Sequence, residues 1–434
     1  MKNIIAFALV VGILACFALP VIAQSNSDQT TSQQKKDISR YTLPPEKYHK
    51  AVAYARARYK IYFTSVIYGI VLLLILLYAR IAPAYRNLAE SVTRRRILQA
   101  LIFVPLLLLT LAVLTLPIDI YSQTLALKYD QSVQTWKSWA WDWTKGQLIG
   151  YAIMSLLIWI LYAIMRKTPR RWWFYFWLAS LPIIVFLLFI SPVIIEPLFF
   201  KFQPLDQKQP ELVTQIERVI QRGGLSIPRN KMFEMEASEK LKSANAYVTG
   251  FGASKRVVVW DTTISRMTIP ETLYVFGHEM GHYVLGHIPK TIAFVSIVLL
   301  IFLYLGYLGM HWIVGAGNGR FAIKNIEDWA SLPVLMLLFS IFSFIATPLF
   351  SSYSRTHEHE ADIYGLEVIH GIVPEPQKVA AQAFQILGEI NLSDPDPSPF
   401  IKIWLYDHPP LNERLIFARN YDPWSKGQPT KFVK

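Results

Sequence analysis

Six long apolar runs, nearly free of charged residues, constrain this chain more than any other feature. They occupy residues 61–78, 97–118, 148–165, 172–200, 292–310 and 332–350. About 20 apolar residues are enough for a helix to cross the hydrocarbon core of a bilayer, and a charge at the bilayer centre costs about 3 kcal/mol on insertion scales. The runs therefore predict a mainly α-helical, polytopic membrane protein. Glu196, the exception, is expected to face a cavity or the membrane interface.

The N-terminal segment has the pattern of an export signal. Lys2 precedes an apolar run at residues 4–15, and Val21-Ile22-Ala23 fits a signal-peptidase site. The first interpretation is a signal peptide over residues 1–23, the second is a retained first membrane helix, and the third is a lipoprotein site at Cys16. The polar residues 24–40 predict a linker.

Two polar stretches, residues 201–290 and 351–434, must lie on the same side of the membrane, because the fifth and sixth runs between them make two crossings. We therefore predict a single extramembrane unit built from both stretches. The expected domains are an N-terminal membrane domain at 41–200 and a second domain at 201–434 that includes the spans 292–310 and 332–350.

The second domain also contains signals for smaller elements. Residues 207–223 show the periodicity of an amphipathic helix. Two β-rich segments, Ala246–Thr249 and Arg256–Trp260, flank Gly250-Phe251-Gly252 and predict a hairpin or small sheet. The domain is thus expected to be mainly helical with a small β component.

The net charge of +13 is concentrated beside the apolar runs. Arg94-Arg95-Arg96, with Arg86, precedes the second run, and residues 166–171 form a second basic cluster. This placement is typical of topology signals and lipid headgroup contacts, not of nucleic-acid binding. The positive-inside rule puts both clusters in the cytoplasm, which favours the periplasmic face for the 201–434 domain. The alternative is the cytosolic face, because the first orientation also places the basic segment 35–60 outside.

The sharpest chemical signal is His278-Glu279-Met280-Gly281-His282. Thr268 and Glu271 fit a capping box, so the motif is expected on a helix. Residues i and i+4 share a helix face, which allows both histidines to bind one Zn²⁺ while Glu279 reaches the metal-bound water. This pattern predicts a zincin-like metallopeptidase, and a surface histidine pair is the alternative.

A catalytic zinc site needs a third protein ligand. A metzincin pattern through His287 fails, because Leu285 and Ile288 stand where glycine and histidine are required. We therefore expect His287→Ala to retain metal and activity. A later segment, residues 354–362, offers Glu358 as the ligand, with Asp362 and Arg355 on the same helix face. Spacing alone leaves three competitors for the ligand position, which are His357, His359 and Glu360.

These motifs together resemble the type I CAAX prenyl proteases and their bacterial relatives. The resemblance covers nearly the whole chain from Tyr41, including Thr42-Leu43-Pro44-Pro45-Glu46. It rests on H-E-M-G-H at 278–282, S-R-T-H-E-H-E-A-D at 354–362, S-A-N-A-Y at 243–247 and D-H-P-P-L-N-E-R at 407–414.

The resemblance implies one Zn²⁺ per chain, bound by His278, His282 and Glu358, with Glu279 catalytic. It makes Asp362 either a proton donor or an acid that orients a metal ligand. It also places Asn245 and Ala246 on a strand that receives the substrate, and His408 and Arg414 near the scissile carbonyl. The alternatives are a turn-capping role for His408 and a structural role for Arg414.

We interpret the chain as an integral membrane zinc metalloendopeptidase of a bacterial inner membrane, acting on peptide or protein substrates. Two departures from the eukaryotic family matter. Its members have seven spans and a catalytic domain toward the cytosol, and prenylated CAAX substrates belong to eukaryotic cells. Membrane or misfolded proteins are therefore expected as substrates. The alternative is a degenerate transporter or structural membrane protein, although no run carries the paired ionisable residues of an ion relay. The sequence does not predict the oligomeric state.

Overall fold

The computed structural model describes residues 39–250, 255–317 and 319–433. The expectations for residues 1–23, for most of 24–40 and for the turn at 251–252 lie outside this part of the chain. The longer helices are α2 (Pro45–Tyr78), α3 (Ile81–Val92), α4 (Arg96–Lys128), α5 (Trp136–Lys167), α6 (Trp172–Ile190), α8 (Pro210–Arg222), α10 (Ile269–Val284), α11 (His287–Ala316), α12 (Leu332–Ile369), α13 (Pro376–Ile390) and α15 (Leu411–Asn420). Shorter helices are α7 (Leu205–Lys208), α9 (Asp261–Ile264) and α14 (Pro399–Leu405).

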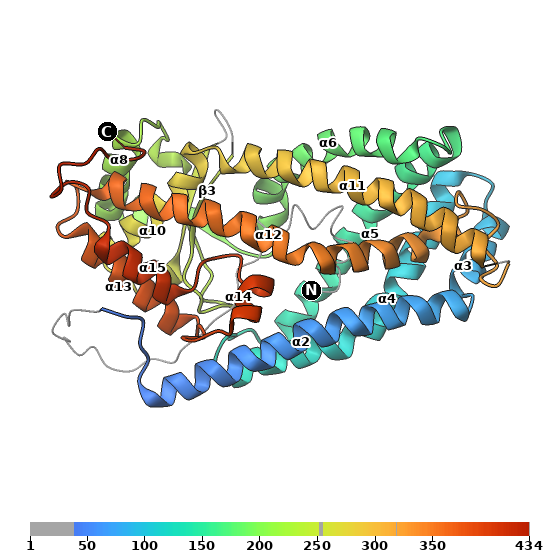
Figure 1. Cartoon of the computed structure of the whole chain (residues 1–434), viewed down its shortest axis with the longest axis horizontal. Helices are drawn as coiled ribbons and strands as arrows, with labels where there is room; N and C mark the ends of the chain where they lie inside the picture. The colour runs from blue at the N-terminus through green and yellow to red at the C-terminus, as the bar shows by residue number, and fades with distance from the viewer. Residues whose placement is uncertain (1–38, 251–254, 318, 434) are drawn as a thin grey trace.

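All six predicted spans are helical, and each helix contains a window long and apolar enough to cross a membrane. Most of these helices run beyond the apolar sequence, whereas regular α-helix in the fourth run, 172–200, ends at Ile190. For example, α2 starts 16 residues before residue 61, and α12 continues 19 residues past residue 350. Figure 1 shows α12 running from the membrane bundle into the end that contains α10, α13 and α15. A single helix therefore connects the bundle with the predicted motif region.

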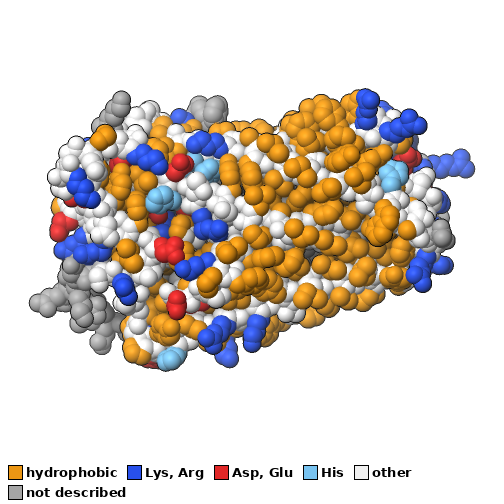
Figure 2. Space-filling view, in the orientation of Figure 1, with side chains coloured by type: hydrophobic (Ala, Val, Ile, Leu, Met, Phe, Trp, Pro, Cys, Tyr) orange, Lys and Arg blue, Asp and Glu red, His pale blue; other side chains and the backbone are white. Residues whose placement is uncertain are grey.

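The surface of the membrane bundle differs from that of the ends of the molecule. Figure 2 shows a broad apolar band over the helical bundle, with charged side chains gathered toward the two ends of the molecule. Exposed apolar residues on this bundle include Ile67, Leu101, Leu156 and Ile297. A continuous apolar band of this kind is the surface that lipid tails cover.

The two basic clusters lie at the same end of the bundle, because α4 and α5 cross it twice between them. Arg94, Arg95, Arg170 and Arg171 are exposed there. Arg86 differs from them: it is buried and forms an ion pair with Asp328. It therefore closes the end of the bundle and adds no free charge to the basic surface.

The small sheet has four strands in the order β1-β2-β4-β3. The strands are β1 (Phe202–Pro204), β2 (Met232–Met235), β3 (Ala246–Thr249) and β4 (Arg256–Trp260). The predicted pairing of β3 with β4 is confirmed as antiparallel, with Ala246 opposite Val259. β2 runs parallel to β4, and β1 is antiparallel to β2. β3 is thus an edge strand, and it packs beside α10.

The single amphipathic helix predicted at 207–223 is wrong in one respect, because the structure has two helices there. α7 ends at Lys208 and α8 begins at Pro210. Gln209 leaves the helical region with φ −133° and ψ 60°. The cause is Pro210, which lacks an amide hydrogen and disfavours a helical conformation in the residue before it.

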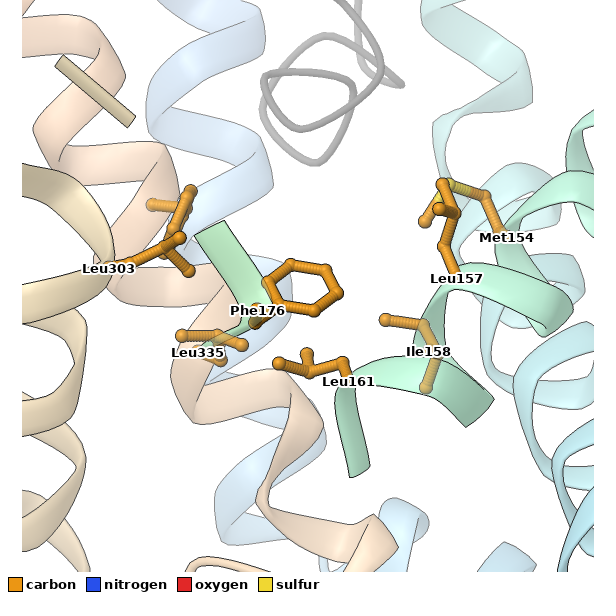
Figure 3. A pocket seen from close by; sticks show the side chains of 8 residues that line it. Met154, Leu157, Ile158, Leu161, Phe176, Leu303 and Leu335 are labelled. Atoms are coloured by element: carbon orange, nitrogen blue, oxygen red, sulfur yellow. The ribbon is translucent and has the colours of Figure 1, made fainter. Parts of the chain in front are cut away.

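The two largest apolar cores of the described residues are separate from each other. One joins α8, α10, α13, α15 and the sheet, and includes Ile216, Val259 and Phe276. The other lies inside the membrane bundle. A cavity in that bundle has only apolar walls (Figure 3), formed by Met154, Leu157, Ile158, Leu161, Phe176, Leu303, Leu335 and Phe339. Its lining offers no charged or hydrogen-bonding side chain, so we assign it no chemistry.

Three glycines let α10 and α12 pack closely. A Cβ at Gly277 would lie 2.8 Å from Val368 Cγ1, and one at Gly281 would lie 3.0 Å from Tyr364 Cβ. A Cβ at Gly365 would lie 3.1 Å from the backbone nitrogen of His278. The two helices that carry the predicted ligands therefore approach each other through glycine.

We expect Gly365→Ala to destabilise the folded protein by about 1–3 kcal/mol, because the new methyl group meets α10 backbone that cannot rotate away. Thermal unfolding in detergent should show a lower Tm. Gly150→Ala in α5 is the matched control, since nothing lies within 4 Å of its added Cβ. An unchanged Tm for Gly365→Ala would show that the two helices can separate without cost.

Candidate metal centre

Helix α10 presents the H-E-M-G-H motif as predicted. Thr268 and Glu271 form the capping box, in which each side chain accepts a hydrogen bond from the backbone of the other residue. Pro270 lies in the first turn, where its missing amide hydrogen costs nothing. His278 is buried, whereas His282 is partly exposed. The capped helix starts at Ile269, nine residues before His278, so the motif lies on regular helix.

Three side chains from α10 and α12 converge on one point. His278 Nε2 lies 3.2 Å from His282 Nε2. Glu358 completes the triangle, with Oε2 3.3 Å from His278 Nε2 and Oε1 3.4 Å from His282 Nε2. Ligands about 2.0–2.1 Å from a tetrahedral zinc are themselves separated by roughly 3.3 Å. The three residues therefore have the spacing that a single zinc ion requires.

The state of Glu358 supports this arrangement. Its side chain is buried, and no contact of Oε2 with the described residues has hydrogen-bond geometry, although nitrogens of His278, His408 and Arg414 lie 3.2–3.6 Å away. A buried carboxylate is costly unless positive charge compensates it, and a metal ion held by the triad would add to the charge of these side chains. Among the described residues, this His-His-Glu triad is the one cluster of histidine, cysteine and acidic side chains close enough to hold a metal ion.

Asp362 orients His278 from behind. Asp362 Oδ1 lies 2.9 Å from His278 Nδ1, which leaves Nε2 facing the triad. Arg414 grips the same carboxylate in a fork, with Nε donating to Oδ2 at 2.9 Å and Nη2 donating to Oδ1 at 2.6 Å. Burial disfavours a charge on His278, but its close contacts with the carboxylates of Asp362 and Glu358 prevail and raise its pKa to about 10. In the metal-free state a proton therefore competes with the metal for this side chain.

Arg355 does not supply the countercharge that its helix position suggested. Its Nη1 donates to the carbonyl oxygens of Lys402 and Tyr406, at 3.1 and 2.5 Å. Arg414 takes that role, because α15 packs against α12 near Asp362. Arg355 instead holds the segment that leads to His408.

The three competitors for the ligand position lie outside the triad. His357 stacks on His287, with ring centroids 4.2 Å apart. His359 is exposed and contacts the ring of Phe417. Glu360 lies 3.1 Å from His287. Each of these three side chains therefore has its contact outside the triad of His278, His282 and Glu358.

Glu279 follows the first histidine directly and lies partly buried at the same site. Burial raises the pKa of its carboxyl, and the negative charge of Glu358 adds to this, whereas His278 and His282 oppose it. A raised pKa makes the carboxylate a better proton acceptor near neutral pH.

The remaining predicted residues surround the triad on other elements. His408 is half exposed, and its Nε2 lies 3.2 Å from Glu358 Oε2. Burial opposes a charge on His408, but Glu358 and Asp407 prevail and raise its pKa to about 9. Asn245 leads into the edge strand β3, and its carbonyl oxygen accepts a hydrogen bond from Trp260 N. Ala246 is fully buried at the start of that strand.

Comparisons with known proteins agree with this geometry. A family model described as "CAAX prenyl protease N-terminal, five membrane helices" matches residues 28–201, and the model of peptidase family M48 matches residues 206–422. A Bacillus subtilis protein named "Uncharacterized metalloprotease YhfN" is 35% identical, over 87% of this chain and 86% of its own length. The chain belongs to peptidase family M48. It is therefore a membrane metalloprotease.

Further similarities to M48 proteins extend over most of the chain. CAAX prenyl protease 1 of Saccharomyces cerevisiae is 27% identical, over 89% of this chain and 90% of its own length. The crystal structure of S. mikatae Ste24p matches with a TM-score of 0.74 and 25% identity, over 97% of this chain and 99% of that one. These findings confirm a polytopic helical membrane protein with a small sheet, and the Bacillus relative is consistent with a bacterial membrane.

Sequence reasoning about this M48 peptidase missed two groups of residues. Tyr274 lies one turn before His278 and donates a hydrogen bond to Asp362 at 3.3 Å. Its spacing of four residues from a motif histidine was the available signal. His287 and Glu360 were considered only as ligands, yet His287 lies 2.9 Å from His282. No spacing rule finds that contact, because it depends on the angle between α10 and α11.

Proposed function

We propose that this M48 peptidase is a zinc endopeptidase in which His278, His282 and Glu358 bind the metal and Glu279 is the general base. The observation that carries the proposal is the triad, whose ligand atoms lie 3.2–3.4 Å apart. Two imidazoles and one carboxylate are one of the ligand sets found in catalytic zinc sites, which keep a fourth position open for water. When bound, it supplies Lewis-acid chemistry by polarising the scissile carbonyl and acidifying water.

The protein side of the reaction is a proton transfer. Glu279 accepts the proton of the attacking water and then passes it to the leaving amine. Asp362 was the other candidate donor. Because Arg414 occupies both of its oxygens, the contacts favour a role for Asp362 in holding His278. Replacing one partner of such a buried pair typically costs about 3–5 kcal/mol.

Substrate recognition is proposed to use the edge strand and the exposed histidine. β3 ends the sheet beside α10, and an extended peptide can pair with the free edge of such a strand. We infer that Asn245 and Ala246 belong to this receiving segment. His408 faces the triad from its exposed side, where it can donate a hydrogen bond to the attacked carbonyl. Arg414 is buried behind the ligands, which favours its structural role.

The proposed substrates are membrane or misfolded proteins, on the reasoning that prenylated CAAX proteins are eukaryotic. The chain is similar to proteins named CAAX prenyl protease 1, and this similarity supports a peptide bond as the target. The alternative of a degenerate transporter or structural protein gains no support from the site, because the ligands and the base are all present. Zinc content of the purified protein, measured beside hydrolysis of an unfolded reporter protein, tests the proposal. A hydrolysing protein that holds no zinc would refute it.

A further inference from the structure

The second motif histidine is held by another histidine. His287 Nδ1 lies 2.9 Å from His282 Nδ1, and His287 Nε2 lies 3.1 Å from Glu360 Oε2. His287 is only 2% exposed, so water does not replace either contact. His282, His287 and Glu360 thus form a chain of three side chains that leads away from the triad. We call this chain the His-His-Glu relay.

The hydrogen positions in the relay follow from the metal triad. His282 Nε2 faces Glu358 and His278, so it must be free of hydrogen to bind a metal. A neutral His282 then carries its hydrogen on Nδ1 and donates it to His287 Nδ1. His287 has its own hydrogen on Nε2, where Glu360 accepts it. One tautomer of each ring satisfies every contact.

The relay joins the site to two membrane-spanning helices. His287 is the first residue of α11, and Glu360 lies on α12. Gly286 has φ 68°, a left-handed conformation that turns the chain between α10 and α11. This turn brings His287 back against His282. The ring of His357, on α12, stacks on the ring of His287, with an angle of 4° between the ring planes.

The outer nitrogens of the two histidine ligands therefore have different partners. His278 contacts the carboxylate of Asp362, which Arg414 binds. His282 contacts the neutral imidazole of His287, which in turn contacts Glu360. A hydrogen-bond partner on the outer nitrogen of a metal-binding histidine fixes its tautomer and orientation, and its loss typically weakens metal binding about 10- to 100-fold.

We propose that His287 and Glu360 are positioning residues that hold His282 in its metal-binding tautomer. This inference rests on the proposed zinc centre. It also replaces the expectation from sequence that His287→Ala leaves the metal untouched.

Zinc affinity of the purified full-length protein, measured by competition with a chromophoric chelator, tests the relay. We expect His287→Ala and Glu360→Ala each to weaken zinc binding about 10- to 100-fold. The double variant should be little weaker than His287→Ala, because both changes break the same chain. His359→Ala is the matched control on α12, since His359 is exposed and its ring lies against that of Phe417.

The Tm of each metal-free variant shows whether weaker zinc binding results from a destabilised fold or from a misplaced His282. Glu360→Gln retains an oxygen that accepts the His287 hydrogen, so it should bind zinc more tightly than Glu360→Ala at an equal apo Tm. Zinc affinity within about twofold of wild type in both His287→Ala and Glu360→Ala would overturn the relay. Equal zinc binding by wild type and Glu358→Ala would instead overturn the zinc centre itself, and the relay with it.

Discussion

Glu279→Gln is expected to lose more than a hundredfold in peptide hydrolysis while retaining a full complement of zinc. The amide has nearly the same shape as the carboxylate but cannot accept the proton of the attacking water, and general-base contributions usually exceed a hundredfold. Glu279 is not one of the three residues of the triad, so the metal should stay. Turnover of an unfolded reporter protein and elemental analysis of the same sample measure the two effects.

Glu217→Gln is the matched control for this substitution. Glu217 lies on α8 and pairs at the surface with Arg229, so the variant should hydrolyse the reporter at the wild-type rate. Activity of Glu279→Gln within about tenfold of wild type would show that another group accepts the proton. Loss of zinc from Glu279→Gln would show instead that this side chain supports metal binding.

Glu358→Ala is expected to abolish zinc binding and hydrolysis together. The substitution removes the only carboxylate of the triad and leaves two imidazoles, which is fewer than the three protein ligands of catalytic zinc sites. Zinc at a concentration of 100 times its Kd stabilises a folded protein by about 2.7 kcal/mol. Added zinc should therefore raise the Tm of the wild-type apo-protein and leave that of the variant unchanged.

His359→Ala again serves as the control, because it removes a potential ligand type from the same helix without touching the triad. It should keep the zinc-dependent rise in Tm. Full zinc occupancy in Glu358→Ala would show that a different side chain completes the site.

The sequence alone was sufficient to predict the membrane spans and the helix that carries the H-E-M-G-H motif. The six apolar runs predicted six helices because the cost of burying charge in a bilayer is local to each segment. The capping box at Thr268 and Glu271 predicted the start of α10 because its contacts join residues three apart. The pairing of β3 with β4 was predictable for the same reason. A local effect also explains why the single helix predicted at 207–223 was wrong. Proline disfavours a helical conformation in the residue before it, and Pro210 therefore separates α7 from α8.

The partners of the motif residues were decided only by the tertiary structure. Sequence spacing did not separate Glu358 from His357, His359 and Glu360, because the four are consecutive residues on about one turn of α12. The close packing of α10 on α12 through Gly277 and Gly365 brings Glu358, and not its neighbours, to the two imidazoles. The packing of α15 against α12 pairs Asp362 with Arg414 instead of Arg355. The turn at Gly286 brings His287 into contact with His282. These contacts depend on the distances and angles between helices, which a spacing along one helix does not contain.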